Sequence, residues 1–190
     1  MSKRIDPSAI EISTEEIDAD LHYPAAAPGS SGRGDDDPAT EWWARPLTVR
    51  WSDVDANGHM RNTAYSDFAT EARLAYFAER GVPPARLRDL GIAPVLLTEQ
   101  VAYRREAMLG EELSVSVALA ALSGDASRGT VTQRIKKPDG ATAALVTIEA
   151  GWLSLESRRI VAPPEELAHV LRTAPRTPGF RPLAELDADC

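Results

Sequence analysis

The sequence contains one cysteine, Cys190, and this cysteine is the last of the 190 residues. No disulfide can form within the chain, and no zinc site can be built from cysteines. Apolar runs are far shorter than the ~20 residues that cross a bilayer, and acidic residues stand where the apolar part of a secretion signal would lie. These absences predict a cytoplasmic protein without a membrane anchor.

Positive charge is also scarce, since the formal net charge is −8, which argues against nucleic acid as a partner. The excess of acidic over basic residues is unevenly distributed along the chain. Residues 1–44 hold three cations and ten acids, residues 45–172 hold sixteen of each, and residues 173–190 hold two cations and three acids. The acidity therefore belongs to the N-terminal part of the chain, and the remainder is close to neutral.

This division predicts three segments. Residues 1–44 are rich in proline, glycine, serine and like charges, a composition typical of a disordered arm. Residues 45–172 have the composition and length of one globular domain, and residues 173–190 carry prolines that predict an extended tail. No internal repeat is present.

Within the domain, residues 47–51 alternate and are rich in β-formers, which predicts a strand. A polar loop follows, and then a helix that runs from Asn62 or Thr63, as N-cap, to about Arg80 and ends at Gly81. Apolar residues recur at helical spacing on one face of it, three of them alanines that suit close packing on a sheet: Tyr65, Phe68, Ala69, Ala72, Ala75 and Tyr76.

After a short turn at 86–90, the pattern predicts strands at 93–105, 112–122, 128–136 and 141–156. Turn signals separate these strands, and two prolines at 163–164 open a last helix that extends to about residue 171. One long helix against one antiparallel sheet is an α+β arrangement. Strands of this length predict a curved sheet that wraps the helix, which is the hot-dog fold.

Polar side chains occupy every second position of the loop before the helix: Asp53, Asp55, Asn57 and His59. A helix N-terminus offers free N–H groups to an anion or to a developing oxyanion. A carboxylate beside it can act as a general base or as a nucleophile. The loop is therefore the candidate catalytic site.

Three other interpretations of this loop compete with the catalytic one. Its first half matches a calcium-binding loop, but Ala64 stands where the bidentate glutamate is required. Zinc is disfavoured because His59 has no second histidine at ligand spacing. An Asx-rich capping loop without chemistry is compatible with local composition. Serine hydrolases are disfavoured because no Gly-x-Ser-x-Gly motif occurs.

The segment from Trp51 to Tyr65 resembles the Asp-x-Asp-x-Asn-x-His-x-x-Asn-x-x-Tyr signature of acyl-ACP thioesterases. More broadly, it is similar to the 4-hydroxybenzoyl-CoA thioesterase branch of the hot-dog superfamily. A second segment, Tyr103-Arg104-Arg105-Glu106, resembles a Tyr-Arg-Arg-Glu stretch of the same enzymes. Two motifs in the correct order make the resemblance specific.

The resemblance implies roles for five residues. Asp55 matches the catalytic carboxylate, and Asn57 and His59 match the residues that assist it. Asn62 matches the position whose backbone N–H polarises the thioester carbonyl, and Glu106 matches a glutamate proposed to activate water. Ala107 stands where these enzymes often have cysteine, so no thiol nucleophile is available there. Asp53 is expected to close the turn.

The residues and the resemblance are compatible with more than one role for three of these residues. Asp55 either attacks the thioester directly or deprotonates water. His59 either assists catalysis or only forms hydrogen bonds with the loop backbone. Glu106 is either a functional residue or an ordinary charged residue at the end of a strand. Basic and aromatic residues are candidates for binding the substrate: Arg61, Tyr65, Phe68, Arg104 and Arg105.

The resulting hypothesis is a thioesterase of fatty acid metabolism that hydrolyses an acyl-CoA or acyl-ACP thioester and needs no cofactor or metal. The alternative is a hot-dog module that binds acyl-CoA without catalysis or serves as a docking scaffold. The resemblance implies a homodimer or a dimer of dimers, because a single hot-dog unit has exposed sheet edges.

Overall fold

The computed structural model describes residues 42–183. A short strand and a helical turn, β1 (Trp43–Thr48) and η2 (Trp51–Asp53), precede the long helix α2 (Asn62–Ala78). The remaining elements follow in chain order: α3 (Pro84–Asp89), β2 (Ile92–Tyr103), β3 (Glu112–Ser123), β4 (Arg128–Lys136), β5 (Thr142–Ser154), α4 (Glu165–Arg172) and β6 (Arg176–Leu183).

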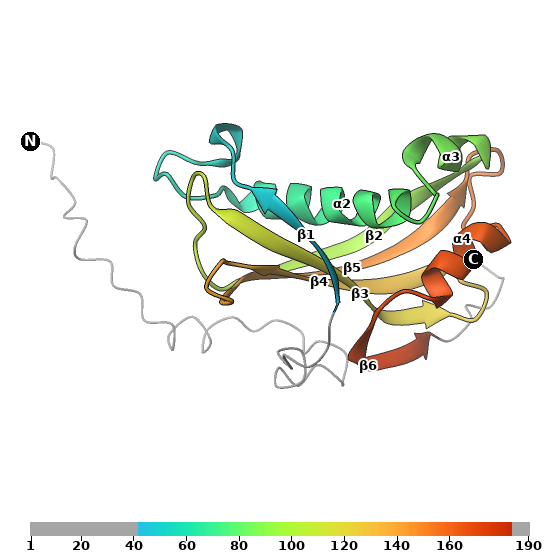
Figure 1. The fold of residues 1–190 in the computed structure, drawn as a ribbon. Helices are drawn as coiled ribbons and strands as arrows, with labels where there is room; N and C mark the ends of the chain where they lie inside the picture. Colours follow the sequence, from blue (N-terminus) through green and yellow to red (C-terminus); the bar gives the residue numbers. More distant parts are fainter. Residues whose placement is uncertain (1–41, 184–190) are drawn as a thin grey trace, which may run out of the picture. The chain divides into compact units, whose positions relative to one another are not determined.

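The strands form one sheet in the order β1-β3-β4-β5-β2, and all neighbours in this order are antiparallel. β6 pairs with β3 in parallel, beyond the stretch of β3 that β1 covers. The sheet curves beneath α2, so the fold has one helical layer and one sheet layer (Figure 1). The predicted α+β hot-dog arrangement is confirmed.

The core lies between α2 and the concave face of the sheet. The predicted apolar face of α2 is buried, apart from the partly exposed Ala75. At the middle of the helix, the buried side chain of Gln133 on β4 donates through Nε2 to the carbonyl oxygen of Ala69 at 2.9 Å. This close approach requires a small side chain at position 69, which is fully buried.

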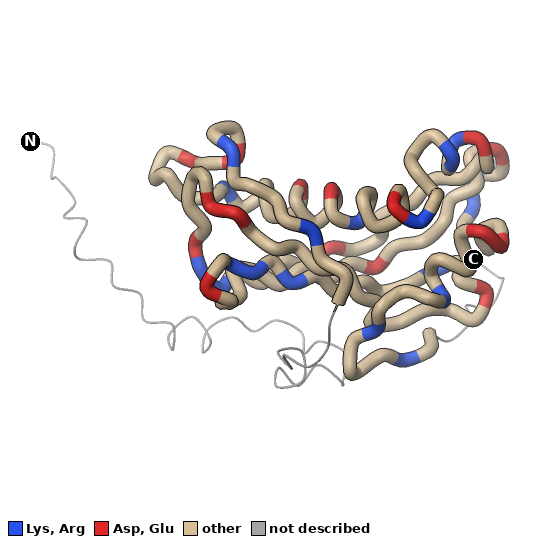
Figure 2. The backbone as a smooth tube through the Cα atoms, viewed as in Figure 1, with Lys and Arg blue, Asp and Glu red and all other residues tan. Residues whose placement is uncertain are grey.

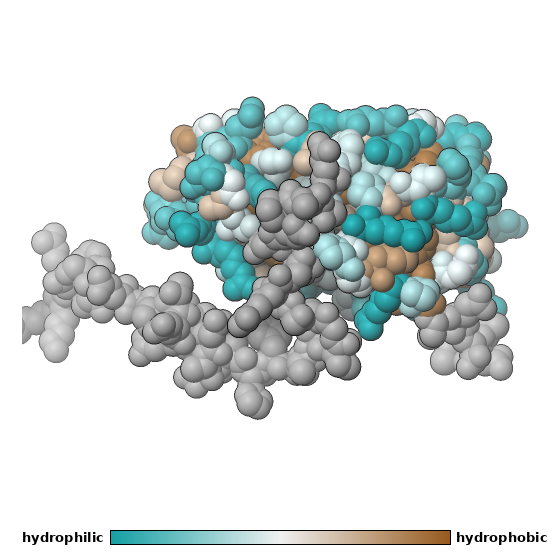
Figure 3. Space-filling model, turned by 60° about the horizontal axis from the view of Figure 1, so that its bottom comes forward, coloured by the Kyte–Doolittle hydropathy of each residue, from teal (hydrophilic) through white to brown (hydrophobic). Residues whose placement is uncertain are grey.

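The opposite face of the sheet comes forward in Figure 3, where polar surface separates smaller apolar areas. Within residues 42–183, no helix is both long enough and apolar enough to cross a membrane.

The structure departs from the sequence prediction at three places. The first strand ends at Thr48, because the Asp53 carboxylate accepts the Arg50 N–H and turns the chain into η2. The helix begins after Arg61, and neither Asn62 nor Thr63 is its N-cap. The expected tail from residue 173 includes β6, which extends the sheet. The predicted acidic arm at 1–44 lies almost wholly outside the described residues.

Ala69→Leu is expected to lower the free energy of unfolding by about 1–3 kcal/mol, because the larger side chain must enter a closely packed helix–sheet contact. Urea denaturation measures this change. Ala78→Leu, at an exposed position of the same helix, is the control and should change the stability by less than about 0.5 kcal/mol. Equal effects of the two substitutions would contradict the close packing at residue 69.

Candidate active site

The loop between η2 and α2 is closed by backbone hydrogen bonds. The Asp55 N–H donates to the His59 carbonyl oxygen at 2.8 Å, and the Gly58 N–H donates to the Asp55 carbonyl oxygen at 3.1 Å. Val54 and Met60 pair as an antiparallel bridge at its base. Gly58 has φ +80°, a left-handed conformation that favours glycine. The loop is therefore a defined turn that holds its polar side chains in set positions.

Asp55 serves both as a turn former and as an exposed carboxylate. Its Oδ1 accepts the backbone N–H groups of Asn57 at 2.8 Å and of His59 at 3.3 Å. Within residues 42–183 its other oxygen, Oδ2, has no hydrogen-bond partner. The side chains of Asn57 and His59 are exposed beside it. One carboxylate oxygen is therefore held by the loop while the other remains available to a reactant.

The start of α2 lies directly after this loop. The Ala64 N–H donates to the Arg61 carbonyl oxygen, whereas the first N–H groups of a helix, here those of Asn62 and Thr63, have no intrahelical acceptor. The carbonyl oxygen of Asn62 accepts the Tyr103 hydroxyl at 3.2 Å, which joins the end of β2 to this point. The structure thus brings Asp55 and the predicted oxyanion-binding N–H of Asn62 to adjoining segments.

Arg61, a predicted substrate-binding residue, forms hydrogen bonds at the start of α2. Its guanidinium donates to the Ser52 carbonyl oxygen at 3.3 Å, to the Thr63 hydroxyl and to the Asp67 carboxylate at 3.0 Å. These bonds tie the first turn of α2 to η2. Three of its five N–H donors are engaged in this way, so Arg61 stabilises the helix start.

Asp53 holds the chain at the start of the loop, as expected for a turn-closing residue. Its side chain is buried, and its Oδ2 accepts both the backbone N–H and the guanidinium Nε of Arg50 at 2.9 Å. The hydrogen bond from the Arg50 side chain holds the pKa of the Asp53 carboxyl below its ordinary value, although burial acts in the opposite direction. Its carbonyl oxygen accepts the Arg61 N–H at 2.8 Å.

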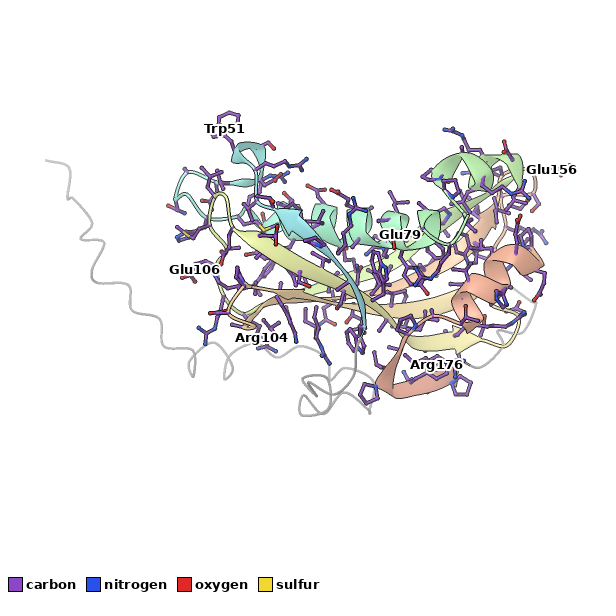
Figure 4. All side chains as sticks on the ribbon, viewed as in Figure 1. Trp51, Glu79, Arg104, Glu106, Glu156 and Arg176 are labelled. Carbon is purple, nitrogen blue, oxygen red and sulfur yellow. The ribbon has the colours of Figure 1, made fainter. Side chains whose placement is uncertain are left out.

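The second motif lies against the same loop. The Met60 N–H donates to the Ala107 carbonyl oxygen at 2.8 Å, and His59 and Met108 form an antiparallel bridge. Glu106 is exposed just beyond the end of β2, and Figure 4 shows its side chain at the same end of the molecule as Trp51. Sequence positions fifty residues apart are thereby brought together around the loop.

Sequence reasoning missed the ion pair that holds this second segment. The Lys137 ammonium lies 3.0 Å from the Glu111 carboxylate and donates to the Glu106 carbonyl oxygen at 2.7 Å. The Glu111 carboxylate also accepts the Met108 N–H at 2.9 Å. The opposite charges at 111 and 137 carry no local signal, because only the sheet brings the hairpin that contains Lys137 next to Glu111.

The other predicted substrate-binding residues divide into two groups. Tyr65 and Phe68 are 3% and 2% exposed, so both are core residues. Burial raises the pKa of the Tyr65 hydroxyl. Arg104 and Arg105 are exposed, their backbone N–H groups both donate to the Ala143 carbonyl oxygen, and neither side chain forms an ion pair with a described residue. Figure 2 shows basic segments gathered at this end of the sheet.

Two features bear on the chemistry of the site. No group of histidine, cysteine, aspartate or glutamate side chains suited to a metal ion occurs between residues 42 and 183. A cavity of about 260 Å³ lies between the second half of α2 and the sheet, with an almost wholly apolar lining. An apolar cavity of this kind suits an apolar group such as a hydrocarbon chain.

A comparison with protein families decides the assignment, because residues 49–171 match the model described as the Thioesterase-like superfamily. The chain belongs to this superfamily. The match contains the loop, α2, the Tyr103–Glu106 segment and the whole cavity.

Individual proteins are similar to this chain in sequence or in fold. A protein of Aquifex aeolicus named "Putative esterase" is 27% identical over 124 residues, which are 65% of this chain and 93% of that protein. A hypothetical protein of Staphylococcus aureus, solved in complex with CoA, matches with TM-score 0.63 and 21% identity over 72% of this chain and 87% of that one. A 1,4-dihydroxy-2-naphthoyl-CoA thioesterase from Synechocystis matches with TM-score 0.64 and 15% identity over 70% and 97%.

The Arg50–Asp53 contact in this thioesterase-like chain has a testable dependence on pH. Because the folded-state pKa of Asp53 is depressed, its contribution to stability is present above the unfolded-state value of about 3.9 and is lost as the pH falls below it. Asp53→Asn should lower the free energy of unfolding at pH 7 by about 1–3 kcal/mol. The difference from wild type should shrink between about pH 5 and pH 2.

Urea denaturation at several pH values measures both effects. Asp139→Asn is the matched control, since the exposed Asp139 carboxylate also accepts a backbone N–H, that of Ala141 at 2.9 Å. Its effect should stay below about 0.5 kcal/mol. If the difference in the free energy of unfolding between wild type and Asp53→Asn stays constant with pH, the Arg50–Asp53 ion pair does not stabilise the fold.

Proposed function

We propose that the protein hydrolyses an acyl-CoA or acyl-ACP thioester to a free acid and a thiol, with Asp55 as the catalytic carboxylate. The observation that carries this proposal is the exposed Asp55, whose Oδ2 is unbonded among the described residues, in the loop that leads directly into the first turn of α2. Membership of the Thioesterase-like superfamily supports the reaction class. The CoA bound to one structural neighbour and the activity named for another favour CoA as the carrier.

The reaction follows from these groups. The thioester carbonyl oxygen accepts the N–H groups at the start of α2, which makes the carbonyl carbon more electrophilic. As general base, Asp55 takes a proton from water, and the hydroxide adds to the carbonyl carbon. The oxyanion of the tetrahedral intermediate gains most from the helix N–H groups. The C–S bond then breaks, and the thiolate receives the proton from Asp55.

A second route uses the same atoms. Asp55 Oδ2 adds directly to the carbonyl carbon, the thiolate leaves, and water hydrolyses the resulting anhydride. In both routes the exposed Asn57 and His59 lie beside Asp55, where they orient water or stabilise the leaving sulfur, and Glu106 is a further exposed carboxylate close to the loop. Arg104 and Arg105 supply exposed positive charge for the phosphates of the carrier.

Asp55→Asn is expected to lower kcat by about 10²–10⁴-fold, the usual contribution of a general base. The amide keeps an oxygen that can accept the Asn57 and His59 N–H groups, so the loop should persist while the basic group is lost. Release of free thiol from acyl-CoA and acyl-ACP thioesters of varied chain length measures the activity.

Asp125→Asn provides a matched control, because the exposed Asp125 carboxylate also accepts backbone and hydroxyl groups, but in the hairpin between β3 and β4. It should retain wild-type activity. Wild-type protein that binds acyl-CoA without releasing thiol from any thioester would contradict hydrolysis and favour the non-catalytic binding module.

We also propose that two copies of the chain associate through β2. Among the described strands, β2 pairs only with β5, so its other edge has unpaired backbone groups. Leu96 and Leu97 on this strand are 49% and 43% exposed, and Leu74 on α2 is 39% exposed. An exposed apolar edge strand is a template for pairing with another strand, and a two-fold pair of β2 strands is antiparallel.

This association has a consequence for the site. The hydroxyl of Tyr103 bonds to Asn62, so the C-terminal end of β2 lies at the catalytic loop. Pro94, Val95 and Leu96, near the other end of β2, line the apolar cavity. In an antiparallel pair the loop end of one strand points toward the cavity end of the other. The acyl group bound at one loop would then enter the cavity of the neighbouring copy.

Leu97→Asp should convert the dimer to a monomer, because residues near the centre of a two-fold strand pair face their own counterparts and like charges there repel. Light scattering or analytical ultracentrifugation should give about 20.5 kDa for the variant and a multiple of it for wild type. Leu155→Asp, at a leucine of similar exposure outside β2, should stay dimeric. A monomeric wild type would disprove the association.

A further inference from the structure

The wall of the apolar cavity contains an arginine. Apart from Thr70, Arg73 and Arg128, every residue that lines the cavity is apolar or glycine. Arg73 lies on α2, one turn before Phe77, and points toward the sheet, since its guanidinium donates to the side-chain oxygen of the buried Gln133. A second donor reaches the Thr70 hydroxyl at 2.8 Å. The guanidinium is therefore held in one orientation at the cavity.

Arg73 is not neutralised by a neighbouring acid. Within residues 42–183 no carboxylate oxygen lies within 4.0 Å of its guanidinium. Burial lowers the pKa of Arg73, and the charge of Glu99 only partly offsets this effect. A guanidinium has five N–H donors, and the described residues accept two of them. Burying a cation with unused N–H donors costs free energy unless an anion pairs with it.

The other arginine of the lining does not share this position. Arg128 lines the cavity from the first residue of β4, at the end of that strand. Arg73 lines it from α2, and its guanidinium is bonded to the buried Gln133. Arg73 is the cation that faces the cavity from the helix, and an anion within the cavity would meet its guanidinium.

We propose that Arg73 binds a carboxylate carried by the acyl group, so that the substrates are CoA or carrier-protein monothioesters of dicarboxylic acids. This proposal rests on the hydrolase function proposed above. A guanidinium forms two parallel hydrogen bonds with a carboxylate, and the apolar lining receives the methylene groups between the carboxylate and the thioester. Gln133 and Thr70 hold the planar guanidinium in place, so little side-chain entropy is lost when the carboxylate binds.

The position of Arg73 agrees with a substrate that spans two copies of the chain. Arg73 is eleven residues from Asn62, which is about 16 Å along the helix. The thioester at one loop and the carboxylate at the Arg73 of the same copy would thus lie far apart. In the antiparallel dimer, the cavity lies toward the loop of the other copy instead. The distance between the two groups then selects the length of the acyl chain.

Relative kcat/KM for two matched CoA thioesters tests the inference: an acyl chain that ends in a carboxylate and one of equal length that ends in a methyl group. Wild type should prefer the carboxylate by about 10- to 100-fold at the best chain length, as expected for hydrogen bonds to a charged group. Arg73→Met should abolish this preference, and Arg88→Met, at an exposed arginine of α3, should leave it intact.

Arg73→Met also removes the donor to the Gln133 oxygen, so its melting temperature is measured alongside. Arg73→Lys retains a cation and a donor but lacks the planar fork. The inference requires that Arg73→Lys prefers the carboxylate-ended thioester less strongly than wild type does. This test applies even if the methionine variant does not fold. An Arg73→Met protein that becomes monomeric would mean that the guanidinium serves the interface, which would overturn the inference.

Calorimetric binding of the free dicarboxylic and monocarboxylic acids separates this inference from the proposed reaction. If wild type hydrolyses both thioesters equally and binds both acids equally, carboxylate recognition is wrong and hydrolysis stands. If wild type hydrolyses no thioester but binds the dicarboxylic acid more tightly, and Arg73→Met removes this difference, recognition stands and hydrolysis is wrong.

Discussion

The hydrogen bonds of Gln133 join the sheet to the long helix, and the rest of the structure depends on this contact. Its amide donates to the Ala69 carbonyl oxygen and accepts from Arg73. A buried amide with unmet hydrogen bonds is costly, so this contact sets the distance between α2 and β4. With the middle of the helix held there, its first turn lies at the polar loop and its second half borders the apolar cavity.

Two aspartates at the loop illustrate how the environment gives the same kind of side chain different contacts. Asp53 is buried and bonded to Arg50, whereas Asp55, two residues later, is exposed and holds the turn through one oxygen only. The first carboxylate stabilises the scaffold and the second can meet a reactant. The buried Asp53 keeps the chain before the loop ordered while the Asp55 carboxylate stays accessible.

The main elements of the fold could be predicted because their signals are local. The helical spacing of Tyr65, Phe68 and Ala72 predicted α2, and the turn signals between the long strands predicted these strands to within a few residues. The helix cap was predicted wrongly, since Arg61 precedes the helix and binds the Thr63 hydroxyl that would have capped it. β6 gave no clear signal, because its prolines disfavour a strand and only pairing with β3 makes it one.

The sequence by itself determined the α+β class, the turn chemistry of the Asp53–His59 loop and its position before a helix, because these depend on residues close in the chain. The tertiary structure decided which distant groups meet that loop: Ala107 against Met60, Lys137 with Glu111, and the end of β2 at Asn62. It also decided that Tyr65 and Phe68 belong to the core and that Arg73 faces a cavity. Such contacts arise only when the sheet folds over the helix, so no local pattern encodes them.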